Sequence, residues 1–286
     1  MPTELKKTGD FLLKSKHHDR PFIADTCYNP SQSKKPCLLF VHGFKGFKDW
    51  GFWNLIAETF ASQGFVFVKL NLSHNGTTPE HPLDFVDLEA FGNNTFSIEL
   101  DDIGFLIDEI ENGNLPIPQV EVDTENIHLI GHSRGGGLAL LKGAEDERIR
   151  SVTAWAPIHD LKERWPREVL EQWEKDGVYY VQNKRTQQEM PLKYSIVEDV
   201  FNNEYRLNIP EAVKRMDKHI MIIHGMEDAT LYYKHSIPLA ASNPLVQLEL
   251  IEGANHSFGG THPYTGDVLP VHMQKAVDYT IHFLRS

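Results

Sequence analysis

Short, continuous apolar runs alternate with amphipathic stretches along most of the chain. The run "CLLFV" (37–41) has no polar position, as expected of a strand buried on both faces. The segment at about 50–62 that follows it has helical spacing. Repeated strand–helix units predict an α/β fold with a mostly parallel central sheet and helices on both faces. The further predicted strands are 65–70, 127–130, 152–155, 220–224 and 247–251, and the further predicted helices are about 97–112 and 271–284.

The first thirty residues follow a different pattern. Residues 10–14 and 21–28 alternate apolar and polar positions on either side of the polar segment "SKHHDR". This period-two alternation predicts an antiparallel hairpin, which brings the expected sheet to about eight strands.

One interval is too long for a single crossover between parallel strands. About sixty residues separate "VTAW" from "IMIIH". Pro166 and Gly177 bracket a predicted helix, with Pro166 at its first position. After it, "VYYV" and "EMPLKYSIV" are predicted to form a hairpin around the polar turn "QNKRTQQ".

We therefore predict that residues 157–217 form a cap. The cap is inserted into a core made of residues 1–156 and 218–286, just before the strand that leads to the candidate acid. Insertions over the edge of a sheet commonly shape ligand pockets. This one is rich in aromatic residues, of which we expect some to form the cap's own core and Trp165 and Tyr180 to line a substrate pocket.

The sequence "IHLIGHSRGGG" places Ser133 on a sharp corner between a strand and a helix. In one interpretation this is a glycine-rich turn that tolerates serine. In the other it is a nucleophile elbow, G-x-S-x-G, which holds the hydroxyl clear of the sheet. A chain of this length contains the pattern by chance about one time in ten, so the choice depends on its other residues.

A serine nucleophile needs a base and a group that orients the base, and both have candidates after strand ends. Asp228 follows the strand "IMIIH", and His256 follows the strand "QLELI". Taken separately, Asp228 could equally well be a helix cap, and His256 could equally well be a solvated loop residue. Glu227 is a weaker candidate for the acid. Three suitable residue types in the order Ser133, Asp228, His256 make coincidence improbable.

Acyl transfer also needs donors for the negative charge that develops on the carbonyl oxygen. The amide of Arg134, directly after the candidate nucleophile, is one candidate. The second is the amide of Phe44 in "HGFKG", which follows the strand at 37–41. The competing interpretation of that segment is a glycine turn with a surface lysine.

The motifs "HGFKG", "GHSRGG", "HGMED" and "GANHSF" stand in the order found in the α/β-hydrolase superfamily, which the sequence resembles over nearly its whole length. It is also similar to bacterial cinnamoyl/feruloyl-esterase-like and serine-aminopeptidase-like members. The resemblance implies the α/β-hydrolase fold with a Ser133–His256–Asp228 triad. In "NLSHNGTTPE" (71–80) the chain departs from the family's usual loop, and no role is assigned to it.

Three further histidines lie beside these motifs. We expect His132 to be a packing residue of the elbow. We expect His42 and His224 to form hydrogen bonds within the loops that they begin.

The composition limits the kinds of binding partner and indicates a cellular compartment. A net charge of −12 argues against nucleic acid or an anionic membrane surface as partner, and it slightly disfavours polyanionic substrates. The start of the chain has no apolar segment of the signal-peptide type, and Cys27 and Cys37 fit two reduced thiols, so we expect a cytoplasmic protein. No metal site or cofactor is predicted, and the oligomeric state is not predictable.

The sequence thus favours a serine esterase acting on a small-molecule ester, of short-chain or aryl (cinnamoyl-type) character, through an acyl-enzyme. Two alternatives stay open. A serine aminopeptidase or amidase would act on a small peptide and would need a cap carboxylate to bind its α-ammonium group. A ligand receptor of the same fold would have a slow or silent triad.

Overall fold

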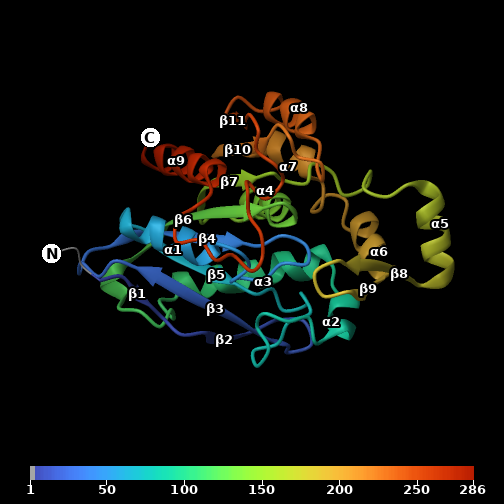
Figure 1. Cartoon of the computed structure of the whole chain (residues 1–286), viewed down its shortest axis with the longest axis horizontal. Helices are drawn as coiled ribbons and strands as arrows, with labels where there is room; N and C mark the ends of the chain where they lie inside the picture. Colours follow the sequence, from blue (N-terminus) through green and yellow to red (C-terminus); the bar gives the residue numbers. More distant parts are fainter. Residues whose placement is uncertain (1–3) are drawn as a thin grey trace.

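The centre of the computed structural model, which describes residues 4–286, is a nine-stranded mixed sheet (Figure 1). Its strands are β1 (Lys6–Lys7), β2 (Phe11–Lys14), β3 (Pro21–Tyr28), β4 (Lys35–Val41), β5 (Val66–Leu70), β6 (Val122–His132), β7 (Ile149–Trp155), β10 (His219–Gly225) and β11 (Val246–Ile251). The spatial order is β1-β3-β5-β4-β6-β7-β10-β11, and β2 also pairs with β3. Since β1 and β2 share one edge of β3, nine strands occupy eight positions across the sheet.

Every pairing from β5 to β11 is parallel, whereas the N-terminal strands are antiparallel to their neighbours. In β4 the residues alternate between two apolar clusters. Leu39 and Val41 belong to one cluster, and Leu38 and Phe40 belong to the other. Burial on both faces explains the continuous apolar run of this strand, and the predicted parallel sheet is confirmed.

Helices cover both faces of the sheet. Buried residues of α1 and α9 contribute to one apolar cluster, and those of α3 and α4 contribute to the other. The helices are α1 (Trp53–Ser62), α2 (Leu88–Gly92), α3 (Phe96–Glu111), α4 (Arg134–Glu145), α5 (Arg167–Asp176), α6 (Ser195–Asn202), α7 (Ile209–Arg215), α8 (Ser236–Ala241) and α9 (Val271–Arg285), with short 3-10 turns η1 (Gln119–Glu121) and η2 (Tyr233–His235).

The N-terminal hairpin is confirmed, with Phe11 opposite Ala24 and Lys14 opposite Pro21 in the β2–β3 register. Cys27 and Cys37 are both free and buried, as predicted. Over residues 4–286, no helix combines the length and the apolar character needed to cross a membrane.

Between β7 and β10 the chain forms α5, the hairpin β8 (Val178–Asn183) and β9 (Gln188–Lys193), α6 and α7. Pro166 directly precedes α5 rather than opening it, and Gly177 ends the helix in the left-handed conformation, with φ of 72°. The predicted second strand was too long, because Ser195–Val197 already belong to α6.

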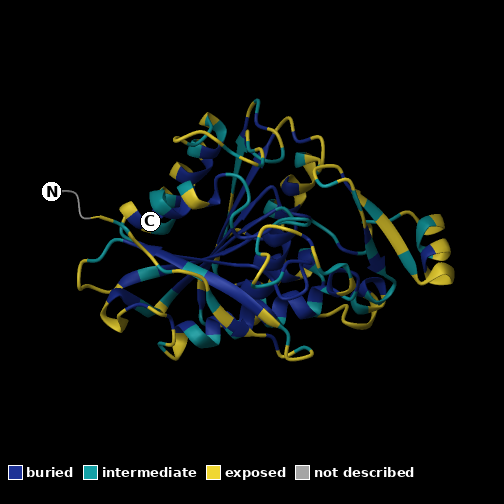
Figure 2. Cartoon of the chain, turned by 60° about the horizontal axis from the view of Figure 1, so that its bottom comes forward, coloured by how far each residue is buried: buried dark blue, intermediate teal, exposed yellow. Residues whose placement is uncertain are grey.

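Figure 1 places α5 and the β8–β9 hairpin at the end of the molecule farthest from the N-terminus. Much of α5 and β8 is exposed (Figure 2), whereas β9 packs against α2. Helix α7 packs against α4 and α8, in the helical layer over the sheet. The division into a core and a cap at 157–217 stays a prediction.

Candidate active site

Ser133 lies at the turn between β6 and α4 in a strained backbone conformation. Its φ of 58° and ψ of −118° are unfavourable for any residue with a side chain. Three hydrogen bonds hold the turn: the Ser133 amide donates to the Trp155 carbonyl at 2.8 Å, and the Ser133 carbonyl accepts from the amides of Gly137 and Ile158, both at 3.2 Å. This geometry is that of a nucleophile elbow, which presents the hydroxyl beyond the end of the sheet.

The glycines after Ser133 are explained by close backbone contact. Helix α4 begins so near to the end of β4 that a Cβ atom on Gly135 would overlap the carbonyl oxygens of Val41 and His42. Only glycine permits this approach without displacing the backbone of one element or the other.

The three residues predicted as a triad meet at the carboxyl ends of the parallel strands. His256 Nε2 lies 2.9 Å from Ser133 Oγ, and His256 Nδ1 lies 2.7 Å from Asp228 Oδ2. Strands β10 and β11 are parallel neighbours, so the loops that carry Asp228 and His256 leave the sheet side by side. With Nδ1–H donating to Asp228, Nε2 is free to accept the serine proton.

Asp228 is held from several sides, and its side chain is fully buried. Its Oδ1 accepts from the amides of Thr230 at 2.7 Å and Leu231 at 2.8 Å, and His224 Nε2 lies 3.0 Å from its Oδ2. Burial raises the pKa of the Asp228 carboxyl, but the hydrogen bonds of His224, His256 and Leu231 outweigh it, and the net pKa lies well below the usual value. Asp228 is therefore a carboxylate in the neutral pH range.

Two buried histidines flank this arrangement. His132 Nε2 donates to the carbonyl of His256 at 2.8 Å, and its ring packs 5.5 Å from that of Trp53. His42 Nδ1 donates to the Gly43 carbonyl at 2.9 Å. Burial lowers the pKa of His42 to about 4 and that of His132 to about 3, so both are neutral near pH 7. As predicted, His132 is a buried packing residue, and it also anchors the loop that carries His256.

The two predicted oxyanion donors belong to segments that both adjoin Ser133. Phe44 and Gly43 line the same cavity as Ser133, and a Cβ atom on Gly43 would lie 3.1 Å from Ser133 Cβ. Arg134 opens α4, where backbone amides lack partners within the helix. Over residues 4–286 neither the Phe44 amide nor the Arg134 amide has an acceptor, so both are available to a bound carbonyl oxygen.

The Arg134 side chain fixes the first turn of α4. Its Nε donates to Glu99 of α3 at 2.7 Å, and its guanidinium stacks 4.2 Å from the centre of the Phe96 ring. Both side chains of this ion pair are nearly fully buried. The arginine therefore points away from the cavity, and only its amide faces the reaction site.

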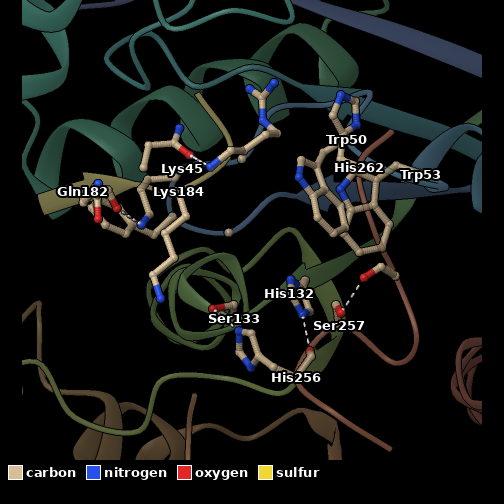
Figure 3. A pocket seen from close by; sticks show the side chains of 16 residues that line it. Lys45, Trp50, Trp53, His132, Ser133, Gln182, Lys184, His256, Ser257 and His262 are labelled. Atoms are coloured by element: carbon tan, nitrogen blue, oxygen red, sulfur yellow. Dashed lines mark hydrogen bonds between the residues drawn. The ribbon is translucent and has the colours of Figure 1, made fainter. Parts of the chain in front are cut away.

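Ser133 and His256 open onto a cavity of about 450 Å³. In Figure 3, Lys45, Gln182 and Lys184 lie on one wall, and Trp50, Trp53 and His262 lie on the opposite wall. Ser133 and His256 lie below both groups in this view. The residues that line the cavity come from five segments: 43–46, 50–53, 132–133, 182–185 and 256–262.

Trp165 and Tyr180, which were predicted to line a substrate pocket, are not among the residues that line this cavity. The Trp165 ring packs edge-on to that of Trp173, 5.3 Å between centres, and Tyr180 is 56% exposed on β8. The aromatic wall is built instead by Trp50 and Trp53, which precede and begin α1.

The loop 71–80 supports the site from behind. Asn71 accepts from the Lys48 amide at 2.7 Å and donates to Thr77 and to the Pro82 carbonyl, and Asn75 donates to the Gly46 carbonyl at 3.2 Å. These bonds fix the turn that carries Phe44.

Sequence reasoning missed the contact between His224 and Asp228, although it correctly predicted that His224 bonds its own loop, through the Leu231 carbonyl at 3.0 Å. The four-residue separation of His224 and Asp228 was the available signal. Glu227 is exposed, and Asp228 is the carboxylate that faces His256.

The sequence matches a known protein family. Residues 38–265, more than half of the chain, match the alpha/beta hydrolase family. No curated protein sequence matches the chain.

Three solved structures have a similar fold. Est1E from Butyrivibrio proteoclasticus has a TM-score of 0.68 and 17% identity, with 97% of this chain and 98% of Est1E covered. A putative hydrolase from Agrobacterium vitis S4 has a TM-score of 0.70 and 17% identity, with coverage of 99% and 98%. Alpha/beta hydrolase domain-containing protein 10 from mouse has a TM-score of 0.67 and 15% identity, with coverage of 97% of each chain.

Proposed function

The chain belongs to the alpha/beta hydrolase family, and from that premise we propose that it is a serine esterase that cleaves carboxylic esters through an acyl-enzyme. The observation that carries the proposal is the position of His256, which links Ser133 Oγ to the buried carboxylate of Asp228 through its two ring nitrogens. A serine hydroxyl is a weak nucleophile unless a base accepts its proton, and this arrangement supplies the base.

In the acylation step, Ser133 Oγ attacks the ester carbonyl while His256 Nε2 takes the hydroxyl proton. Asp228 stabilises the imidazolium that forms and holds the ring in place. The amides of Phe44 and Arg134 donate to the carbonyl oxygen as it becomes negative. When the tetrahedral intermediate collapses, His256 returns the proton to the leaving alcohol.

In the second step, water replaces the alcohol. His256 accepts a proton from water, which attacks the acyl carbon, and Ser133 leaves with that proton. The product acid then departs from the cavity, and the residues named above are sufficient for both steps.

The composition of the cavity wall favours an ester over a peptide with a free amino terminus. An aminopeptidase needs a carboxylate to bind the substrate's α-ammonium group, and within residues 4–286 no Asp or Glu lines the cavity. The glutamates of the cap region that were considered for this role are Glu171, Glu174, Glu189 and Glu198, and none of them lines it.

The test is a labelled fluorophosphonate, which reacts covalently with activated serines. We expect the wild-type protein to be labelled at Ser133 and the Ser133→Ala variant to stay unlabelled. A panel of p-nitrophenyl esters and aminoacyl arylamides then separates esterase from amidase activity. The panel should include cinnamoyl-type esters, since Est1E, which has a similar fold, has been solved with ferulic acid bound.

Each alternative has its own outcome in this experiment. Hydrolysis of arylamides but not of esters would replace the esterase proposal with an amidase. Labelling without turnover on either panel would instead favour a receptor with a silent triad. The proposed partner is a small-molecule ester, with neither nucleic acid nor membrane, and the cytoplasmic location stays a prediction.

A further inference from the structure

The charged residues that line the cavity are all cationic, although the whole chain has a net charge of −12. Lys45, Lys184 and Arg185 contribute the positive charges, and no aspartate or glutamate of the described residues lines the cavity. In the part of the chain that the structure describes, none of these three cations forms an ion pair with a carboxylate. The local charge of the cavity is thus opposite to that of the protein.

Lys45 is the cation next to the proposed reaction centre in the chain. It directly follows Phe44, a proposed oxyanion donor, and its Nζ donates to the Gln182 carbonyl of β8 at 3.0 Å. Burial and the neighbouring charge of Lys184 lower the pKa of Lys45. The Lys45 and Lys184 ammonium groups therefore repel one another, and over residues 4–286 neither is paired with a carboxylate.

Arg185 is placed by aromatic contacts at the β8–β9 turn. Its guanidinium lies 5.7 Å from the centre of the Phe47 ring and 5.9 Å from that of Phe85. Lys184 and Arg185 of this turn therefore add a second and a third positive charge to that of Lys45 at the cavity.

A buried donor without a partner lies beside these cations. Asn183 is 5% exposed and lines the cavity, and its Oδ1 accepts from the Arg185 amide at 3.2 Å. Its Nδ2 has no hydrogen-bond partner over residues 4–286. A buried donor normally has an acceptor, and a bound anion would supply one.

We infer that this cavity selects esters whose acyl or alcohol half carries a carboxylate, bound between Lys45, Lys184, Arg185 and Asn183. The inference rests on the proposed esterase function and names its substrate class. Figure 3 places Lys45 and Lys184 on the wall opposite Trp50 and Trp53, with Ser133 below both. A substrate carboxylate on the cationic wall leaves room for apolar atoms against the tryptophans.

Long-range attraction and ion pairing should raise kcat/KM for anionic esters. Lys184 and Arg185 are exposed, so water and salt weaken each contribution. We expect a combined preference of about tenfold at low salt, which should shrink as the ionic strength rises above about 0.1 M.

The experiment compares two matched ester pairs. The first pair is p-nitrophenyl hydrogen adipate and p-nitrophenyl methyl adipate, which share the leaving group and differ in charge on the acyl half. The second pair, meta-carboxyphenyl butyrate and its methyl ester, places the charge on the alcohol half. The ratio of kcat/KM, anionic over neutral, is measured for each pair, and the pair with the larger ratio identifies the half that carries the anion.

Variants then test the residues. Lys184→Met and Arg185→Met should each lower the ratio about threefold, whereas Lys184→Arg, which keeps the charge, should retain it. The matched control is Lys175→Met, which removes an exposed lysine of α5 outside the cavity and should leave the ratio at the wild-type value.

Binding without turnover separates the two proposals. Ser133→Ala protein, titrated calorimetrically with monomethyl adipate and dimethyl adipate, should bind the monoanion more tightly. Equal affinities, together with ratios near one for both pairs in the wild type, would overturn this inference while leaving the esterase function intact. Absence of both ester turnover and fluorophosphonate labelling would overturn the proposed function instead, and this inference with it.

Discussion

Ser133 Oγ has one hydrogen-bond partner in the part of the chain that the structure describes, the imidazole of His256. We expect Ser133→Ala to lower kcat for ester hydrolysis by roughly a thousandfold or more, because the acyl-enzyme can no longer form. The change should alter the free energy of unfolding by less than about 1 kcal/mol, since over residues 4–286 the hydroxyl makes no other hydrogen bond. Steady-state kinetics and thermal melting measure the two effects.

His256 provides the companion measurement. His256→Ala should be about as damaging as Ser133→Ala, and the double variant should be little worse than either, because nucleophile and base act as one unit. Losses that multiply in the double variant would mean that the two residues do not share one mechanism.

His224 is a positioning residue for the acid. Its Nε2 lies 3.0 Å from Asp228 Oδ2 and its Nδ1 lies 2.8 Å from Ser236 Oγ. We expect His224→Leu to lower kcat about tenfold or more with little change in KM, since Asp228 loses one of its partners while the cavity stays intact. His224→Gln, which retains a donor, should recover part of the rate.

The control for His224 is Ser236→Ala, which removes the hydrogen bond of its Nδ1 and leaves its contacts with Asp228 and Leu231 in place. A purely structural role would lower the melting temperature in both variants and leave kcat unchanged. A rise in KM equal to the fall in kcat/KM would likewise contradict a positioning role.

At the scale of elements, the cavity wall depends on the segment that leads into α1. The Trp50 ring lies 5.8 Å from that of Trp53 and 6.0 Å from that of His262, with which it stacks. We expect Trp50→Ala to change the relative kcat/KM of aryl and alkyl esters by about fivefold, because an aromatic surface contacts these groups differently. A panel of esters with one leaving group and varied acyl parts measures this effect.

Tyr180 is the matched aromatic control, since it is 56% exposed on β8 and does not line the cavity. Tyr180→Ala should leave the same selectivity within about twofold, as expected of a surface change away from the site. If Tyr180→Ala shifts selectivity and Trp50→Ala does not, the substrate binds over the hairpin rather than in the cavity.

At the scale of the whole molecule, buried histidines make stability depend on pH. Burial lowers the pKa of His42, His74 and His128 to about 4 and that of His132 to about 3. The unfolded chain binds these protons near pH 6.5, so unfolding takes up protons between pH 6.5 and about 4. Burial raises the pKa of Asp102 to about 6 and also raises that of Glu99, and both shifts oppose this uptake. Burial lowers the pKa of His159 and of His262, which adds to it. The histidines outnumber these carboxyls, so unfolding takes up protons on balance.

The free energy of unfolding should therefore be highest above pH 6.5 and should fall as the pH drops from 6 to 5. Denaturant titrations at a series of pH values measure this slope. His128 lies away from the cavity and pairs with Ser151 Oγ at 2.7 Å, so His128→Asn should reduce the uptake by about one proton. A stability independent of pH over this range would contradict neutral burial of these histidines.

Much of the fold and the order of the candidate catalytic residues were predictable from sequence. The apolar run of β4 reflects burial on both faces of that strand. The polar turn after residues 11–14 reflects the pairing of β2 with β3 at the edge of the sheet. Both effects act over a few residues, so the sequence shows them. In a parallel sheet, residues after strand ends meet at one edge. Ser133, Asp228 and His256 could therefore be grouped from their positions alone.

The tertiary structure alone decided which side chains surround the reaction centre. Trp165 was predicted to line the pocket, but Trp50 does so, and His224 contacts Asp228 although nothing in the pattern required it. The cationic wall joins Lys45 to the turn at Lys184, far apart in the chain, within a protein of net charge −12. Periodicity indicates which face of an element is buried. The cavity depends instead on how loops from distant segments pack against one another, and on the side-chain rotamers that this packing imposes.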